Sequence, residues 1–225
     1  MRLASRILVL CTVLSACGLR TIHPAGGPSH RYQMSGFSVV APEGHGWWVT
    51  GGRAVTNDAL FVPQDRDVYP PSRANFLMFS QIWSFSNDHS RIGAFAVREG
   101  FTMPAGGLEG LQALLAARLA REIPRSRFAR YEVALAVTDT LGRACVQLTL
   151  DLGFQPWSAT DKHPYVHRGV RYWCPASAAE GSPIVRLGFF EYHRDDDPPR
   201  RDFMPDILPM VRSLEFTGSG TQGSR

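Results

Sequence analysis

Two histidines in the second half of the chain have the spacing of a metal-binding pair. His163 and His167 stand in the pattern H-x-x-x-H, which on a helix would place both imidazoles on one face for zinc. Asp161 could add an oxygen ligand. Pro164 follows the first histidine, however, and leads into a strand-like sequence, so a helix is not expected. The pattern favours solvated histidines, and we expect neither a metal nor a cofactor.

A second group of residues could perform acid–base chemistry. Glu191, His193 and Asp195 occupy alternate positions, which would place their side chains on one face of a strand. Because a carboxylate can orient an imidazole as a general base, a hydrolase that uses His193 with Glu191 or Asp195 is one alternative. The sequence contains no G-x-S-x-G nucleophile motif. We therefore favour a solvated strand end, a non-catalytic protein and no catalytic residues.

Two adjacent tryptophans could contact a ligand or a partner. Trp47 and Trp48 lie in a strand-like segment, so their side chains should point to opposite sides of the strand. An exposed indole could stack on a sugar or anchor a protein partner, whereas helices on both faces of the sheet would bury both rings. We interpret Trp47, Trp48 and His193 as candidate contacts to a partner or a small ligand.

Strand-like segments dominate the elements that must position these residues. They fall at residues 36–41, 46–50, 59–63, 76–85, 92–101, 130–138, 143–152, 166–174 and 184–193. Three consecutive pairs are predicted to form hairpins, namely 76–85 with 92–101, 130–138 with 143–152, and 166–174 with 184–193. In 143–152, Val146, Leu148 and Leu150 alternate with polar residues, so one face of this strand should be buried.

Two helices are expected beside these strands. Residues 108–123 place Leu111, Leu115 and Leu119 along one stripe and stop at Pro124. Residues 203–214 are also amphipathic, although Pro209 should bend or break the helix. Many antiparallel strands with few helices predict an α+β fold, in which two helices cover a twisted antiparallel sheet.

The first 16 residues have the order of a secretory signal. Arg2 and Arg6 precede an apolar run at residues 7–14 that is too short to span a bilayer as a stable helix. The next residues complete Leu14-Ser15-Ala16-Cys17, which resembles the lipobox of bacterial lipoproteins. The resemblance implies cleavage before Cys17 and attachment of membrane lipid to its thiol. An ordinary signal peptide or an uncleaved membrane helix is the alternative.

This resemblance also implies a location and an order of segments. Gly18 is not the aspartate that retains enterobacterial lipoproteins in the inner membrane, so the periplasmic face of the outer membrane is favoured. Residues 17–35 would be the lipidated cysteine and a flexible tether, and a coil of that length holds a domain about 25 Å from the lipid. Residues 36–216 would form a single globular domain, and residues 217–225 a disordered tail.

Charge and cysteine usage fit an exported protein. Removal of the signal leaves 22 basic and 20 acidic side chains without a basic stripe, which argues against a nucleic-acid partner. Cys11 departs with the signal and Cys17 would carry lipid, so Cys145 and Cys174 remain as a pair. In an oxidising periplasm a disulfide is the simplest outcome, and a reactive thiol or two metal ligands are the alternatives.

The order of the elements resembles the PsbP-like fold, which includes accessory proteins of photosystem II and small bacterial lipoproteins. The resemblance spans about residues 36–216, with a helix near mid-chain, paired strands and a closing helix. At its start it rests on Gly36, Phe37, Val39, Pro42, Gly44 and Trp47, and at its end on Ser213, Leu214, Glu215 and Phe216. It implies an α/β/α sandwich that binds a protein partner or assists an assembly, and it brings no catalytic residue. A small-ligand carrier is a further alternative.

Overall fold

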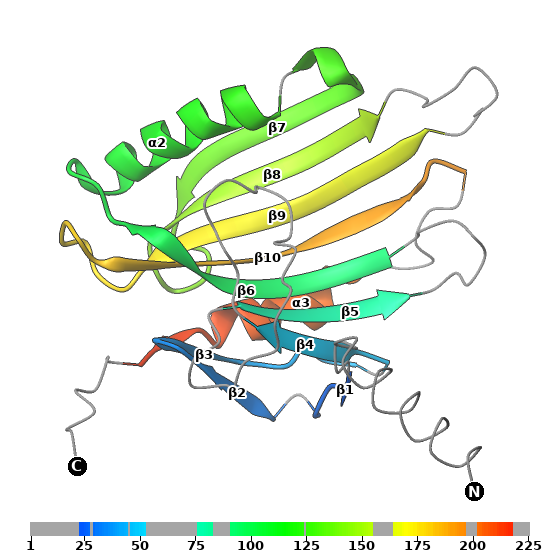
Figure 1. Ribbon diagram of the computed structural model, residues 1–225, viewed down its shortest axis with the longest axis horizontal. Coiled ribbons are helices and arrows are strands. Elements are labelled where there is room, and N and C mark those ends of the chain that lie inside the picture. Colours follow the sequence, from blue (N-terminus) through cyan, green and yellow to red (C-terminus); the bar gives the residue numbers. More distant parts are fainter. Residues whose placement is uncertain are drawn as a thin grey trace, which may run out of the picture.

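An antiparallel sheet forms the centre of the computed structural model, which describes residues 23–27, 29–44, 46–52, 76–82, 91–123, 125–154, 164–196 and 202–217. Within these residues eight strands pair in the order β1-β4-β5-β6-β10-β9-β8-β7 (Figure 1). They are β1 (His23–Pro24), β4 (Trp48–Gly52), β5 (Phe76–Ile82), β6 (Arg91–Thr102), β7 (Phe128–Thr138), β8 (Cys145–Phe154), β9 (Tyr165–Pro175) and β10 (Pro183–Arg194). A smaller antiparallel sheet has the order β11 (Glu215–Phe216), β3 (Phe37–Val40) and β2 (Arg31–Met34). The mixed α+β class predicted from the sequence is confirmed.

The helices in the described part of the chain are α2 (Gly107–Glu122), α3 (Met204–Arg212) and a short 3-10 turn, η2 (Arg125–Arg127). The predicted leucine stripe of α2 is confirmed, because Leu111, Leu115 and Leu119 are its buried residues. The prediction that Pro209 bends or breaks the second helix was wrong in one respect, since α3 continues past this residue to Arg212. Buried side chains on both sides of the proline, Ile207, Met210 and Val211, hold the helix against the sheet.

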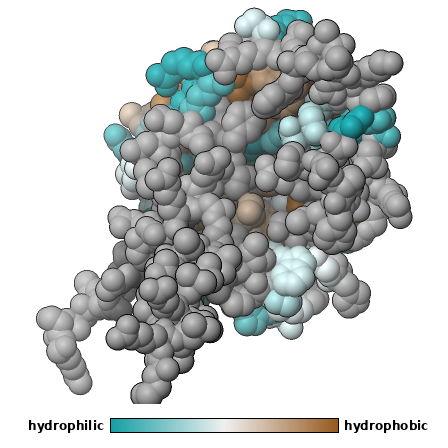
Figure 2. Space-filling view, turned by 45° about the vertical axis from the view of Figure 1, so that its right-hand side comes forward, coloured by the Kyte–Doolittle hydropathy of each residue, from teal (hydrophilic) through white to brown (hydrophobic). Residues whose placement is uncertain are grey.

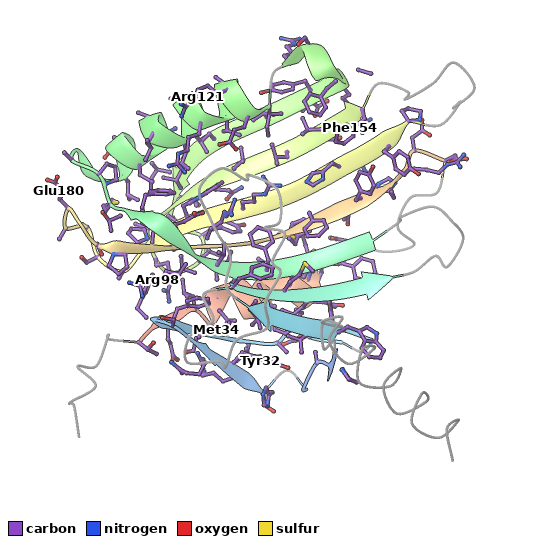
Figure 3. All side chains as sticks on the ribbon, viewed as in Figure 1. Tyr32, Met34, Arg98, Arg121, Phe154 and Glu180 are labelled. Carbon is purple, nitrogen blue, oxygen red and sulfur yellow. A yellow bond between two sulfur atoms is a disulfide. The ribbon has the colours of Figure 1, made fainter. Side chains whose placement is uncertain are left out.

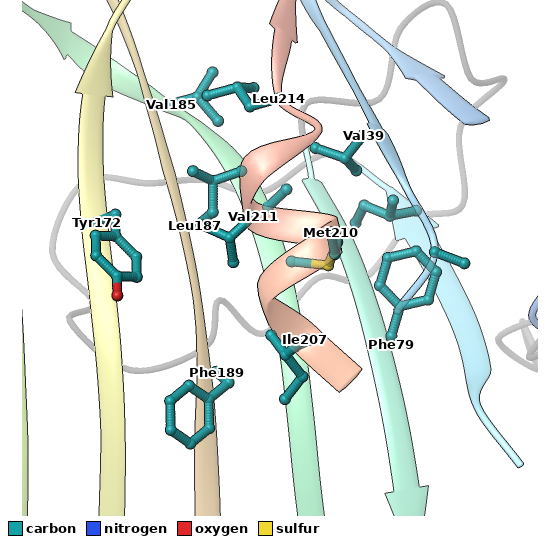
Figure 4. Close-up of a cluster of buried hydrophobic side chains, with 14 of the residues drawn as sticks. Val39, Phe79, Tyr172, Val185, Leu187, Phe189, Ile207, Met210, Val211 and Leu214 are labelled. Atoms are coloured by element: carbon teal, nitrogen blue, oxygen red, sulfur yellow. The ribbon is translucent and has the colours of Figure 1, made fainter. Parts of the chain in front are cut away.

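The two helices pack on opposite faces of the large sheet. Leu111, Leu115 and Leu119 of α2 join a cluster with Val146, Leu148, Leu150 and Leu152, which are the alternating residues predicted to form the buried face of β8. On the other face, Ile207, Met210 and Val211 of α3 pack with Leu187 and Phe189 of β10 and with β3 (Figure 4). Helix α2 contacts β7 and β8, and α3 contacts β10 and β3, so each covers part of a face rather than the whole of it.

The three predicted hairpins are confirmed by the strand pairs β5–β6, β7–β8 and β9–β10. The predicted disulfide is also present: Cys145 and Cys174 lie in the neighbouring strands β8 and β9, with the two Sγ atoms 2.12 Å apart. Both cysteines are fully buried. The signal, Cys17, the strand predicted at 59–63 and residues 218–225 lie outside the described residues.

The predicted tether is shorter than the sequence suggested. Residues 17–35 were expected to be flexible, but His23–Pro24 form β1 and Arg31–Met34 form β2. Strand β1 pairs with β4, and β2 pairs with β3 across the turn at Ser35 and Gly36. Tyr32 and Met34 lie two positions apart on β2 and pack against the core cluster of α3, which explains why this segment folds (Figure 3). Described structure is therefore already present at residues 23–35, before the predicted domain start at residue 36.

Candidate functional site

A surface pocket of about 540 Å³ lies at the edge of the large sheet that β1 and β4 form. Its lining residues come from two chain segments, and they are Pro24, Ala25, Gly26, Gly27, Glu43, Gly44, Gly46, Trp47 and Trp48. Both tryptophans predicted as candidate contacts therefore line this pocket. They differ in exposure, because Trp48 is 46% exposed and Trp47 only 4%. This difference agrees with the prediction that they point to opposite sides of the strand.

Hydrogen bonds fix each wall of the pocket, and one of them joins the two walls. The Trp47 Nε1–H donates to the Glu43 carbonyl oxygen at 2.8 Å. The Ala25 N–H donates to the Trp47 carbonyl oxygen at 2.8 Å, and the Gly26 N–H donates to the Tyr32 hydroxyl at 2.9 Å. The buried Trp47 is thus fixed in position, and the next residue in the chain, Trp48, has an exposed indole.

A backbone hydrogen bond to α3 holds the second wall of the pocket at Glu43. The Glu43 N–H donates to the Asp206 carbonyl oxygen at 2.7 Å. Gly44 and Gly46 have φ angles of 85° and 82°, a left-handed conformation that glycine adopts without strain. The two glycines consequently leave the Glu43 and Trp48 side chains as the long exposed groups among the described residues of this wall.

The chemistry of this pocket suits contact rather than catalysis. Of its described lining residues, Glu43 is the one with an ionisable side chain. An indole surrounded by glycine backbone offers a flat apolar surface with hydrogen-bonding groups at its edge. On the side of the molecule in Figure 2, the visible apolar surface of the described residues is confined to small areas between hydrophilic ones.

His193, the third candidate contact, lies away from the surface. The prediction of a solvated strand end was wrong for this residue, because β10 continues to Arg194 and His193 pairs with Val166 of β9. His193 is 2% exposed, and its Nδ1 lies within hydrogen-bonding distance of the Arg194 carbonyl oxygen. Its Nε2 is buried and has no hydrogen-bond partner among the described residues. This arrangement leaves no open access for a partner at His193.

Glu191 and Asp195 flank His193 in the chain, but the described contact of its ring is with a backbone carbonyl oxygen. Burial raises the pKa of the Glu191 carboxyl, with Asp202 and Asp151 adding to this effect and Arg168 opposing it. The imidazole instead uses Nδ1 for the neighbouring carbonyl group. The proposed orientation of a general base by Glu191 or Asp195 therefore has no support in the contacts of the ring.

The two histidines of the H-x-x-x-H pattern, which were expected to be solvated, are split between described and undescribed parts of the chain. His163 and Asp161 lie outside the described residues. His167 is buried in β9, where its Nε2 lies 3.3 Å from a terminal nitrogen of Arg171 and its ring stacks on Phe190. The structure thus places His167 in the sheet and not in a solvated loop. Within the ranges that the structure describes, no group of three or more histidine, cysteine, aspartate or glutamate side chains could hold a metal ion.

A buried charged cluster on the α2 side of the sheet was not predicted. Glu99 of β6 forms an ion pair with Arg186 of β10, with 2.9 Å between Oε1 and Nε, and accepts a hydrogen bond from Trp173 Nε1 at 3.0 Å. The side chains of Glu99 and Arg186 are 3% and 4% exposed. Arg171 lies in the same part of the sheet, and burial lowers its pKa to about 9, with the charge of Arg186 adding to the effect and Glu122 opposing it.

One sequence signal could have revealed this cluster. Arg186 lies between Ile184 and Gly188 on one face of a strand. The neighbouring residues on that face are apolar, so the alternation predicts that the charged Arg186 side chain is buried. Such a charge needs a buried partner of opposite sign. The contacts of Glu99 with Arg186 and Trp173 form a network that pairs this buried charge within the sheet.

Among the described residues, no helix is both long and apolar enough to cross a membrane.

Comparisons with known proteins suggest no function for the chain. No protein-family model matches the chain, and no curated protein matches it significantly.

Proposed function

We propose that this chain is a bacterial envelope lipoprotein whose folded domain is a non-catalytic binding or assembly module. Lipid on Cys17 would hold it on the membrane, at the periplasmic face of the outer membrane. Its binding site would be the pocket beside Trp48, where it contacts a component of the envelope. The observation that carries the binding proposal is the exposed Trp48 indole, presented at a pocket and supported by the fixed, buried Trp47.

The disulfide supports export of the chain. Cys145 and Cys174 are joined within the core, and structural disulfides persist in oxidising compartments such as the periplasm. The sequence adds the apolar run and the Leu14-Ser15-Ala16-Cys17 segment, which account for how the chain would reach that compartment and stay on its membrane. Dual or triple acylation anchors stably, whereas a single chain gives only marginal binding.

The arrangement of helices supports the finer proposal of a PsbP-like sandwich. A mid-chain helix, α2, packs on one face of an antiparallel sheet, and a closing helix, α3, packs on the other. After α3 follows β11, which pairs with β3. A fold of this kind would serve as a binding or assembly module, which agrees with the pocket chemistry.

Hydrolysis is the less well supported function. The proposed base, His193, is buried and its Nδ1 faces a backbone carbonyl. A small-ligand carrier would need an enclosed cavity, whereas the pocket at Trp48 lies at the edge of the sheet. The contact geometry therefore favours a module that touches an envelope component at its surface.

Two experiments test the proposal. Metabolic labelling with palmitate should mark the wild-type chain, and Cys17→Ala should lose both the label and the membrane association. A photo-crosslinking amino acid at position 48 should capture an envelope component in cells. The control position is Val137 on β7, the other large hydrophobic residue that is exposed in the described part of the chain. Labelling of Cys17→Ala, or equal capture at both positions, would contradict the proposal.

A further inference from the structure

We infer that the component contacted by the Trp48 pocket is the phospholipid surface on which the protein is anchored, with the indole of Trp48 in the headgroup layer. The inference rests on the proposed acylation of Cys17. It follows from where the folded domain begins, from which residues line the pocket, and from the chemistry of the exposed indole.

The chain between the proposed lipid and the domain is short. Five residues, 18–22, separate Cys17 from His23, the first residue of β1. An extended chain spans at most about 3.3–3.6 Å per residue, so the six steps from Cys17 to His23 reach at most about 22 Å, whatever their conformation. The domain would therefore be held close to the lipid headgroups instead of hanging from a long tether.

The point at which the chain enters the domain is also one wall of the pocket. Strand β1 pairs with β4 so that Pro24 is the cross-strand partner of Trp48. Cross-strand partners lie about 4.5–5.5 Å apart between Cα atoms. Pro24, Ala25, Gly26 and Gly27 line the pocket directly after the entry point. The shortest path from the lipid to the domain consequently ends beside the exposed indole, which gives this edge of the sheet the closest access to the bilayer.

The exposed side chain has the chemistry of a membrane-interface residue. Tryptophan is enriched at the headgroup level, where its apolar ring and its N–H group both find suitable surroundings. Trp48 is 46% exposed, and among the described lining residues Glu43 is the one with an ionisable side chain. A single indole binds a membrane weakly, but a short tether raises its effective concentration at that surface and makes the contact intramolecular.

A fluorescent label can report which edge of the sheet faces the lipid. Gly27 is a suitable labelling position, because a Cβ atom built there meets nothing within 4 Å. An environment-sensitive dye on Gly27→Cys, in the lipidated full-length mature protein, would be compared with the same dye on Val137→Cys. Val137 lies on β7, the strand at the other edge of the sheet (Figure 1). Cys145 and Cys174 form a disulfide, so the introduced cysteine is the thiol available for labelling.

The probe is a vesicle of phosphatidylethanolamine and phosphatidylglycerol that carries a quencher in its headgroup region. We expect the emission of the Gly27→Cys dye to shift to the blue on vesicles and to be quenched there, while the Val137→Cys dye keeps its aqueous spectrum. Trp48→Gln in the Gly27→Cys background should abolish the shift. Circular dichroism should show an unchanged fold, because the Trp48 side chain lies at the surface.

Three results would overturn the inference, and one of them separates it from the proposed function. An anchored protein whose Gly27→Cys dye stays in an aqueous environment would show that the pocket faces away from the bilayer, towards a protein partner. A response that is equal at both positions, or that persists in Trp48→Gln, would remove Trp48 as the contact. A chain that neither takes up palmitate nor sediments with membranes would refute the anchor and, with it, this inference.

Discussion

Replacement of Glu99 by glutamine should strongly destabilise the folded domain. Glu99 is ion-paired with Arg186, and both side chains are buried, so Glu99→Gln leaves a cation in the sheet without its closest opposite charge. Removing one partner of a buried ion pair costs about 3–5 kcal/mol. The nearby Glu122 also attracts Arg186, which places the expected loss at the lower end of that range, about 3 kcal/mol. Such a loss is a large fraction of the total stability of an ordinary domain.

The same sheet offers a matched control at Asp151. This carboxylate also contacts two arginines, with Arg130 Nε at 2.8 Å and Arg168 Nε at 2.9 Å. The two arginine side chains are 40% and 46% exposed, so Asp151→Asn should cost about 1 kcal/mol or less. Urea unfolding followed by circular dichroism would give both free energies. If Glu99→Gln costs no more than Asp151→Asn, burial does not set the strength of this network and the reasoning fails.

Three further changes test other parts of the fold. Replacing Cys145 and Cys174 by alanine opens a loop with a sequence separation of 29. In the chain-entropy model the free energy of unfolding should then fall by about 3.6 kcal/mol. A loss of less than about 1 kcal/mol, measured by urea unfolding, would contradict this prediction. Gly188→Ala would push a Cβ atom against a backbone carbonyl oxygen of β9 and should lower the free energy of unfolding by about 1–3 kcal/mol, whereas Gly27→Ala should change it by less than about 0.5 kcal/mol. Because the pKa of Glu191 is higher in the folded chain than its ordinary value of 4.5, wild-type stability should fall as pH rises through the folded pKa. Glu191→Gln should remove that fall, so thermal melts should show a stabilised variant at neutral pH and little difference below the ordinary pKa.

Local patterns predicted the elements whose partners are adjacent in the chain. Alternation along β8 identified Val146, Leu148 and Leu150 as its buried face, and leucine spacing identified the buried stripe of α2. The cysteine count predicted the disulfide, because two cysteines remained after the proposed signal and anchor. In each case the residues of a single segment, or the number of cysteines, were enough to make the prediction.

Features that depend on distant partners could not be predicted in this way. Strands β3 and β4 follow one another along the chain but belong to different sheets, and no local pattern specifies which sheet a short strand joins. Strand β2 looked like tether because its four residues gain their burial from β3 and from the core beyond it. The pocket was missed for the same reason, since its first wall comes from residues assigned to that tether.

The buried charges show that residue type alone does not predict whether a side chain is buried. Arg186 and Glu99 are each usually exposed residues, and each becomes a core residue only because the pairing of β10 with β6 brings them together. His193 is buried for a related reason, because β10 is longer than its apolar pattern and its end stays paired with β9. Strand length set by pairing therefore overrides the polarity of single residues.

The disulfide between β8 and β9 can form only when the two strands pair in the correct register. In the observed alignment Val146 lies opposite Trp173, which brings the preceding and following cysteines together on one face. A shift of one residue would turn one of the two thiols to the opposite face, where no bond can form. Residues 18–225 contain no third cysteine that could capture either thiol. In the proposed mature lipoprotein, with Cys17 acylated, oxidation would therefore have a single intramolecular product, and the disulfide would form only in molecules whose strands are correctly aligned.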